Sequence, residues 1–126
     1  MKKLLNITIS VVILILGSGT YWNTQAAIPA SERAALIDFY NSTNGDSWNR
    51  NDGWKTPPLA EDGFAMPGTE DFWYGITVTS NSVTKIDMNI YKYDDPDWGP
   101  LTYVGNGIEG AIPAEIGNLV NLVSLL

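Results

Sequence analysis

The side chains best suited to catalysis in this 126-residue chain are carboxylates, because His and Cys are both absent. Without imidazole or thiol groups, the chain cannot form a histidine-based triad, a thiol nucleophile or the usual zinc site. The 14 Asp and Glu residues outnumber the 7 Lys and Arg residues, and a net charge of −7 disfavours binding to a phosphate backbone. We therefore expect a non-catalytic protein with no cofactor and no nucleic-acid partner.

One polar segment has some of the residues of a calcium site. It begins at Asn44 and is rich in Asn and Asp as far as Asp52. A calcium loop requires Gly at its sixth position and Glu at its twelfth, where this segment has Asn49 and Lys55. We therefore expect no metal ion here.

A second acidic segment, residues 89–103, is also aromatic. Its distinctive side chains are Tyr91, Tyr93, Trp98 and Tyr103 beside Asp94, Asp95 and Asp97. Sugar rings stack on aromatic side chains and glycosidases use two carboxylates, so a glycan-binding surface is an alternative function. Nothing in the sequence distinguishes an acid from a base among these carboxylates, so hydrolysis is not expected. A surface loop whose aromatic side chains pack on the rest of the protein is the simpler interpretation.

Residues 1–26 have the layout of a secretory signal peptide. Lys2 and Lys3 precede a mostly apolar run over residues 4–16, and small residues follow at Ala26 and Ala27. We expect cleavage after Ala26 or after Ala27, and a secreted, cell-surface or periplasmic product that meets a membrane only during export. An uncleaved anchor is the alternative, but a spanning helix needs about 20 apolar residues and this run is shorter.

The first element expected after the signal is a helix. Pro29 suits its first turn, Ser31 is a possible cap and Glu32 lies near its positive end. Its apolar stripe consists of Ala35, Leu36, Phe39 and Tyr40. Asn44-Gly45 would end it, because both residues tolerate a left-handed conformation.

A loop and two strands come next along the chain. Residues 46–68 show no period, and we expect the indoles of Trp48 and Trp54 to cover apolar surface and donate to backbone carbonyls. Residues 72–79 and 83–88 are predicted strands. In the second, alternation places Val83, Ile86 and Met88 inward and Lys85 and Asp87 outward. Residues 89–103 are expected to form a looped insertion.

Residues 105–126 contain a repeat motif. Leu119, Leu122 and Leu125 are spaced by three, and Asn106 is followed at fixed offsets by Ile108, Gly110 and Pro113. This segment resembles the plant-type leucine-rich repeat, N-x-L-x-G-x-I-P-x-x-I-G-x-L-x-x-L. The resemblance implies that the aliphatic residues point into a coil, and that the Asn106 side chain bonds backbone groups at a corner.

The upstream residues resemble the N-terminal cap of such proteins, in its bacterial version. Residues 31–36, 40–48, 53–54 and 73–78 carry this resemblance. Plant caps have cysteines at the positions of Asp71 and Val78, so here the packing of Trp48, Trp54 and Trp73 must replace a disulfide.

The resemblance implies an α/β solenoid in three parts. The signal covers residues 1–26, the cap covers 27–82, and residues 83–126 form a first repeat and the start of a second. Ile86 and its equivalent Leu125 are 39 positions apart. Repeats of this class recur about every 24 residues, and the insertion at 89–103 accounts for the surplus.

The expected function is that of an exported protein–protein interaction module. Candidate ligand contacts are Lys85, Asp87 and Ser124 on the strand face and Tyr91, Tyr93 and Trp98 in the insertion. The C-terminal face would expose Ile112, Ile116, Leu119, Leu122 and Leu125. We therefore expect further repeats of a longer array, or a partner chain, to cover that face.

Overall fold

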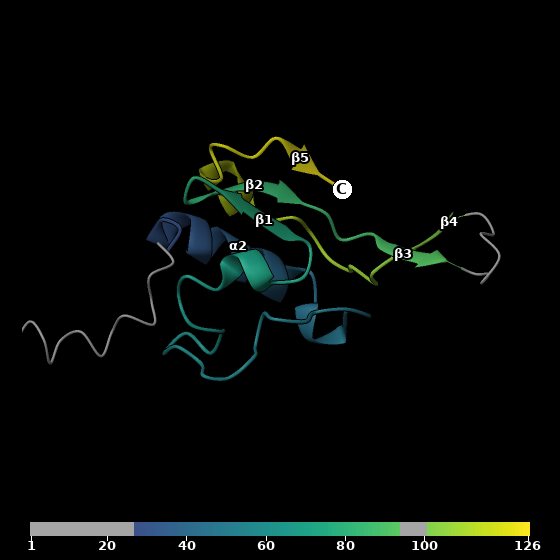
Figure 1. Ribbon diagram of the computed structural model, residues 1–126, viewed down its shortest axis with the longest axis horizontal. Coiled ribbons are helices and arrows are strands. Elements are labelled where there is room, and N and C mark those ends of the chain that lie inside the picture. The colour runs from purple at the N-terminus through teal and green to yellow at the C-terminus, as the bar shows by residue number, and fades with distance from the viewer. Residues whose placement is uncertain (1–26, 94–100) are drawn as a thin grey trace, which may run out of the picture.

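The computed structural model describes residues 27–93 and 101–126 (Figure 1). The α-helix α2 (Ala30–Ser42) buries the expected stripe against the core. It begins after Pro29 without any side-chain cap, so the proposed role of Ser31 as a cap is wrong; Ser31 lies exposed within the first turn. Asn44 ends the helix region in the left-handed conformation (φ 59°), as expected. None of the helices in the described ranges is long and apolar enough to cross a membrane, and the predicted signal lies outside those ranges.

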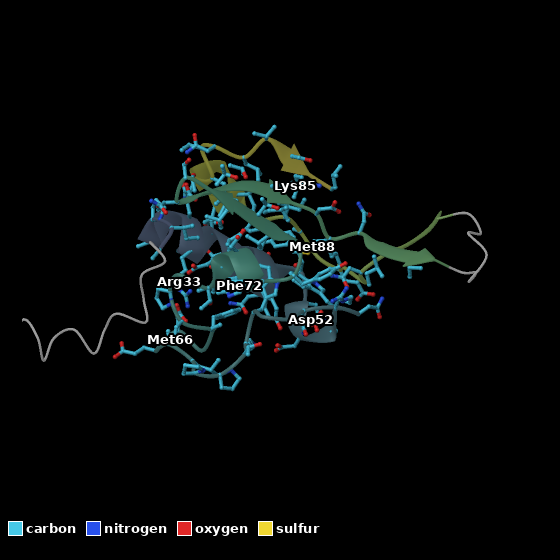
Figure 2. All side chains as sticks on the ribbon, viewed as in Figure 1. Arg33, Asp52, Met66, Phe72, Lys85 and Met88 are labelled. Carbon is cyan, nitrogen blue, oxygen red and sulfur yellow. The ribbon has the colours of Figure 1, made fainter. Side chains whose placement is uncertain are left out.

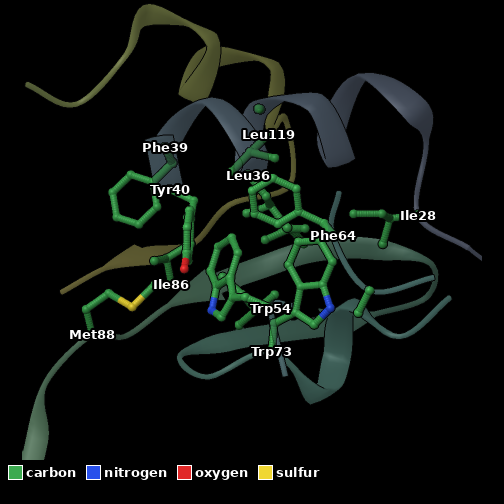
Figure 3. Close-up of a cluster of buried hydrophobic side chains, with 14 of the residues drawn as sticks. Ile28, Leu36, Phe39, Tyr40, Trp54, Phe64, Trp73, Ile86, Met88 and Leu119 are labelled. Atoms are coloured by element: carbon green, nitrogen blue, oxygen red, sulfur yellow. The ribbon is translucent and has the colours of Figure 1, made fainter. Parts of the chain in front are cut away.

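The core is a layer of aromatic side chains between α2 and the sheet (Figure 3). Trp54 is at its centre, with ring centroids 5.4 Å from Trp48 and 4.7 Å from Trp73. As expected, the indole N–H of Trp48 donates to Thr43 O (2.9 Å) and that of Trp54 to Tyr74 O (3.1 Å). The loop that carries these residues includes the 3₁₀ helix η2 (Gly45–Ser47). Residues 46–68 have no periodic pattern of apolar side chains. The two buried indoles nevertheless hold this loop in a fixed position against the core.

Three strands form the central sheet, in the order β1-β2-β5. Strands β1 (Ile76–Thr79) and β2 (Ser82–Ile86) are antiparallel, and β5 (Ser124–Leu125) runs parallel to β2. The strand expected over residues 72–79 starts only at Ile76. The 3₁₀ helix η3 (Glu70–Phe72) and a turn at Gly75 (φ 82°) come first. A Cβ at Gly75 would lie 2.6 Å from Asp87 O, so the turn requires glycine.

The expected insertion is not simply a loop. Strands β3 (Ile90–Tyr93) and β4 (Leu101–Val104) pair as an antiparallel hairpin that extends away from the central sheet in Figure 1. Residues of high β-propensity flank the acidic stretch on both sides, which explains the pairing. Trp98 and the three aspartates lie outside the described residues.

The chain then returns to the core through Asn106, which is 3% exposed. Gly110 passes so close to the carbonyl of Ser42 that a side chain would not fit. The 3₁₀ helix η4 (Ala114–Asn118) packs beside α2, and Leu119 enters the core. Leu119 was expected on an exposed face and is buried instead, because α2 covers it. Ile116 and Leu122 are half-buried, whereas Ile112 and Leu125 are exposed.

Candidate functional site

The outer side of the central sheet brings three predicted contact residues together. The register places Lys85 of β2 between Thr77 of β1 and Ser124 of β5. Lys85 Nζ lies 3.0 Å from Asp87 Oδ2. We call Thr77, Lys85, Asp87 and Ser124 the polar sheet face. Lys85 is labelled in Figure 2, close to β5.

A β-bulge explains how this face forms. Val78 pairs with Val83 and Thr77 with Lys85, so Thr84 is an extra residue on β2. Val83 and Ile86 can therefore both point into the core although three positions separate them, and both are fully buried. Beside the bulge, the hydroxyls of Thr79 and Thr84 lie 3.1 Å apart.

The chemistry of the polar sheet face suits recognition. The Lys85 side chain is 42% exposed and the Asp87 side chain 16%. An ion pair and neighbouring hydroxyls offer hydrogen-bond donors and acceptors to a polar ligand.

The other predicted contacts belong to the hairpin. Tyr91 pairs with Tyr103, and Tyr93 pairs with Leu101. These residues belong to a different sheet from Lys85, and Trp98 lies outside the described residues.

A buried carboxylate supports the polar sheet face from behind. Glu32 is 3% exposed and accepts hydrogen bonds from Ser82 Oγ (2.6 Å) and Val83 N (2.7 Å). Asn121 Nδ2 in turn donates to Ser82 Oγ (2.9 Å), which ties the approach to β5 to the start of β2. The sequence interpretation placed Glu32 only at the helix end. Glu32 lies one helical turn before Leu36, on the buried stripe, and this spacing is the sequence feature that indicates its burial.

A second buried group joins α2 to the Trp-rich loop. Arg33 donates to Glu70 Oε1 (2.7 Å), to both carboxylate oxygens of Asp62 (2.8 and 2.9 Å) and to Ala65 O (2.7 Å). The bonds from Arg33 hold the pKa of Asp62 below its ordinary value. Each carboxylate also accepts a backbone N–H, from Phe64 at Asp62 and from Gly68 at Glu70, so the group holds the loop against α2.

The buried side chain of Tyr40 takes part in a similar arrangement with the exposed carboxylate of Asp46. Its hydroxyl donates to Asp46 Oδ1 (2.8 Å), and burial together with that bond raises the pKa of Tyr40 to about 12. Lys55, with Tyr40 as a second donor, lowers the pKa of Asp46. Tyr40 therefore stays protonated at neutral pH and is not poised to act as a base.

An apolar groove of about 490 Å³ lies beside η3. Pro57, Pro58, Met66 and Phe72 are among its lining residues, and Phe72 is 69% exposed. Figure 2 shows Met66 and Phe72 below the sheet, away from Lys85. Sequence reasoning placed residue 72 in a strand and missed this groove, because no local pattern signals it.

Within residues 27–93 and 101–126, no three acidic side chains lie together in a way that could hold a metal ion. Comparisons with protein-family models, with curated proteins and with solved structures find no match to this chain.

Proposed function

We propose that this chain is the N-terminal cap and first repeat of an exported leucine-rich repeat protein, and that it acts as a non-catalytic protein–protein interaction module. In this proposal the α/β coil starts at β2 and returns at β5. The polar sheet face is the ligand-binding surface. The Trp-rich cap covers one end of the core.

The observation that carries the proposal is the parallel pairing of β2 with β5. Lys85 lies beside Ser124 and Ile86 beside Leu125, although the hairpin separates the two strands in sequence. Adjacent parallel strands joined by a long return segment are the geometry that a repeat coil requires. Asn106 lies in that return segment, and its side chain bonds the backbone of Arg50.

Site-specific photo-crosslinking tests the proposed surface. A benzophenone amino acid at Thr77 lies on the polar sheet face, next to Lys85, whereas the same group at Asp38 lies on the exposed side of α2. With the exporting cell's own envelope and medium proteins, we expect a discrete adduct from position 77 and none from position 38. Lys85→Glu should reduce the adduct several-fold, because it reverses the one positive charge of the face.

Equal labelling from both positions, or labelling that Lys85→Glu leaves unchanged, would contradict the proposal. Thermal unfolding of Lys85→Glu serves as the folding control. The Lys85 side chain is 42% exposed, so its change should leave the melting temperature nearly unaltered.

The hairpin register favours a second candidate, a glycan-binding surface. Tyr91, Tyr93 and Tyr103 belong to the paired strands of this ribbon, and sugar rings stack on aromatic side chains. A glycan array probed with the full chain and with Tyr91→Ala and Tyr93→Ala variants tests this. Binding that both substitutions abolish would support it, and a blank array would remove it.

A further inference from the structure

The two stretches of chain that line the apolar groove beside η3 are joined through their backbones. Ala65 N donates to Trp54 O (2.8 Å), which connects the stretches at one point. They also meet where Gly53 lies against the backbone of Phe72, so closely that a Cβ at Gly53 would clash with Phe72 O. The shape of the groove is therefore set by backbone contacts and by glycine at position 53, and not by the rotamers of exposed side chains.

The exposed ring of Phe72 is held in place by its buried neighbours. Trp73 is 1% exposed, and its ring lies 4.7 Å from that of Trp54 in the core (Figure 3). Phe72 N donates to Thr69 O (2.8 Å) at the end of η3. The Thr69 hydroxyl donates to Met66 O (2.6 Å) and accepts from the Trp73 indole N–H (3.1 Å). The groove is thus formed before any ligand arrives, which lowers the entropic cost of binding.

The chemistry of the groove favours an apolar ligand group. Apart from Thr56 and Thr69, the described residues that line it are apolar or glycine, and the Thr69 hydroxyl already makes two hydrogen bonds within the fold. A sugar would find few hydrogen-bond partners here. A bulky apolar side chain needs none, and the thioether of Met66 can adapt to its shape. The volume of about 490 Å³ lies in the usual range of ligand-binding clefts.

The chain around the groove is acidic. Residues 46–72 contain six acidic and two basic side chains, a net charge of −4. Both basic side chains are already paired within this segment: Arg50 with Asp52 (2.8 Å) and Lys55 with Asp46 (2.8 Å). The remaining negative charge therefore favours a cationic ligand over an anionic one, and it disfavours an anionic membrane surface for the same reason.

Two of these acidic residues border the groove in sequence and have no ion-pair partner in the part of the chain that the structure describes: Glu61 and Asp71. Glu61 is exposed in the turn whose ends meet where Leu59 pairs with Ala65, a lining residue. Asp71 directly precedes Phe72. An apolar groove with unpaired carboxylates beside it is complementary to an apolar group that carries positive charges on its flanks.

We propose that this groove binds a basic peptide segment of a partner protein. One bulky apolar side chain of the segment packs against Phe72 and Met66, and Lys or Arg side chains on either side of it face the carboxylates of Glu61 and Asp71. The groove is separate from the polar sheet face: Figure 2 shows Met66 and Phe72 away from Lys85. This inference therefore does not depend on the function proposed above.

Selection of a phage-displayed library of random heptapeptides on the immobilised full chain tests the proposal. We expect the enriched sequences to combine a bulky apolar residue with flanking Lys or Arg. The most enriched peptide is then synthesised with a fluorescent label, and anisotropy gives its dissociation constant. Phe72→Ser should raise that constant at least tenfold. Glu61→Lys should raise it several-fold at low ionic strength and less at high ionic strength, because salt screens exposed charges.

Two matched controls change the same chemistry outside the groove. Val123→Ser removes an apolar side chain that is 87% exposed, and Glu115→Lys reverses an exposed charge on η4. Both should leave the dissociation constant nearly unchanged. Thermal unfolding checks that Phe72→Ser folds, as expected for a ring that is 69% exposed. If it does not fold, Thr56→Arg decides, because it adds bulk and positive charge at an exposed lining residue without removing buried packing.

Four results would overturn the proposal. The first is a selection in which no sequence is enriched. The second is enrichment of acidic peptides, or of peptides without a bulky apolar residue. The third is binding that folded Phe72→Ser and Thr56→Arg variants leave unchanged. The fourth is binding that Lys85→Glu abolishes and Phe72→Ser does not, which would place the peptide on the polar sheet face and leave the function proposed above intact.

Discussion

Three nearly buried polar side chains join the separate parts of this protein: Glu32, Arg33 and Asn106. Burying such groups is costly unless each finds partners, and here each makes at least two hydrogen bonds. Arg33 joins α2 to the loop through Asp62 and Glu70. These bonds connect residues far apart in sequence, so their loss should destabilise the whole fold.

The Arg33–Asp62 pair predicts a specific acid sensitivity. The pKa of Asp62 is lowered in the folded state, so the pair stabilises the fold above the ordinary carboxylate pKa and the gain is lost as the pH falls through the folded pKa. We expect Asp62→Asn to lower the free energy of unfolding by roughly 0.5–1 kcal/mol at neutral pH, since the partly exposed carboxylate is screened by water. Urea titrations at several pH values measure the difference.

That difference should shrink towards zero as the pH falls below the ordinary carboxylate pKa and then through the lowered pKa of the folded state, because below both values the carboxylate is protonated in both states. Glu61→Gln is the control, because it changes a neighbouring exposed carboxylate. A pH-independent effect of Asp62→Asn would mean that lost packing, and not the ion pair, is responsible.

At the residue scale, the sequence predicted the features that depend on a side chain's own chemistry. Trp48 and Trp54 are large and amphipathic, so burial with a bonded N–H could be expected and is confirmed. The ion-pair partners of Arg33 could not be predicted, because they depend on how an irregular loop packs against α2. The exposure of Phe72 could not be predicted either, because it also depends on the path of irregular chain.

Among the elements, β1 and η3 are joined by a single side chain: the Asp71 carboxylate accepts a hydrogen bond from the backbone N–H of Val78. If the chain is the leucine-rich repeat cap proposed above, these two positions correspond to cysteines of plant-type caps. A disulfide there would hold the same two segments together. The hydrogen bond is the weaker link, because its net contribution is about 1 kcal/mol.

The variant Asp71→Cys/Val78→Cys should therefore form a disulfide when oxidised. Closing so short a loop stabilises by about 2 kcal/mol in the chain-entropy treatment. We expect the oxidised double variant to melt several degrees above its own reduced form, measured by thermal unfolding with and without reductant. The single variant Asp71→Cys is the control and should not respond to reductant at low concentration. A free thiol count of two after oxidation would show that the segments are too far apart.

The bounds of helix α2 were predicted almost correctly, because the helical spacing of its apolar residues can be read within the segment itself. The strands were predicted less well. The turn at Gly75 delays β1, and the bulge at Thr84 breaks simple alternation in β2. The β3–β4 hairpin was missed as structure because its paired residues flank an acidic stretch. Pairing depends on the partner strand, which single-segment patterns do not contain.

At the scale of the whole molecule, the C-terminal segment is held against the core by the contacts of three residues, which we call its anchors. Leu119 packs on the aromatic layer, Asn121 bonds Ser82, and Asn106 bonds the backbone of Arg50 through both its amide atoms. Asn106 is the first of these anchors along the chain. The segment from Asn106 to β5 should consequently open as one unit when that anchor is lost.

Hydrogen exchange of an Asn106→Ala variant tests this cooperativity. The substitution leaves Arg50 N and Arg50 O without their partner, at a cost of about 2–3 kcal/mol. We expect faster exchange at the amides of Leu119, Leu122 and Leu126, while amides within α2 keep most of their protection. Asn118→Ala changes an exposed residue of η4 and should leave the pattern unaltered. Equal loss of protection in α2 would show instead that α2 and the C-terminal segment unfold together.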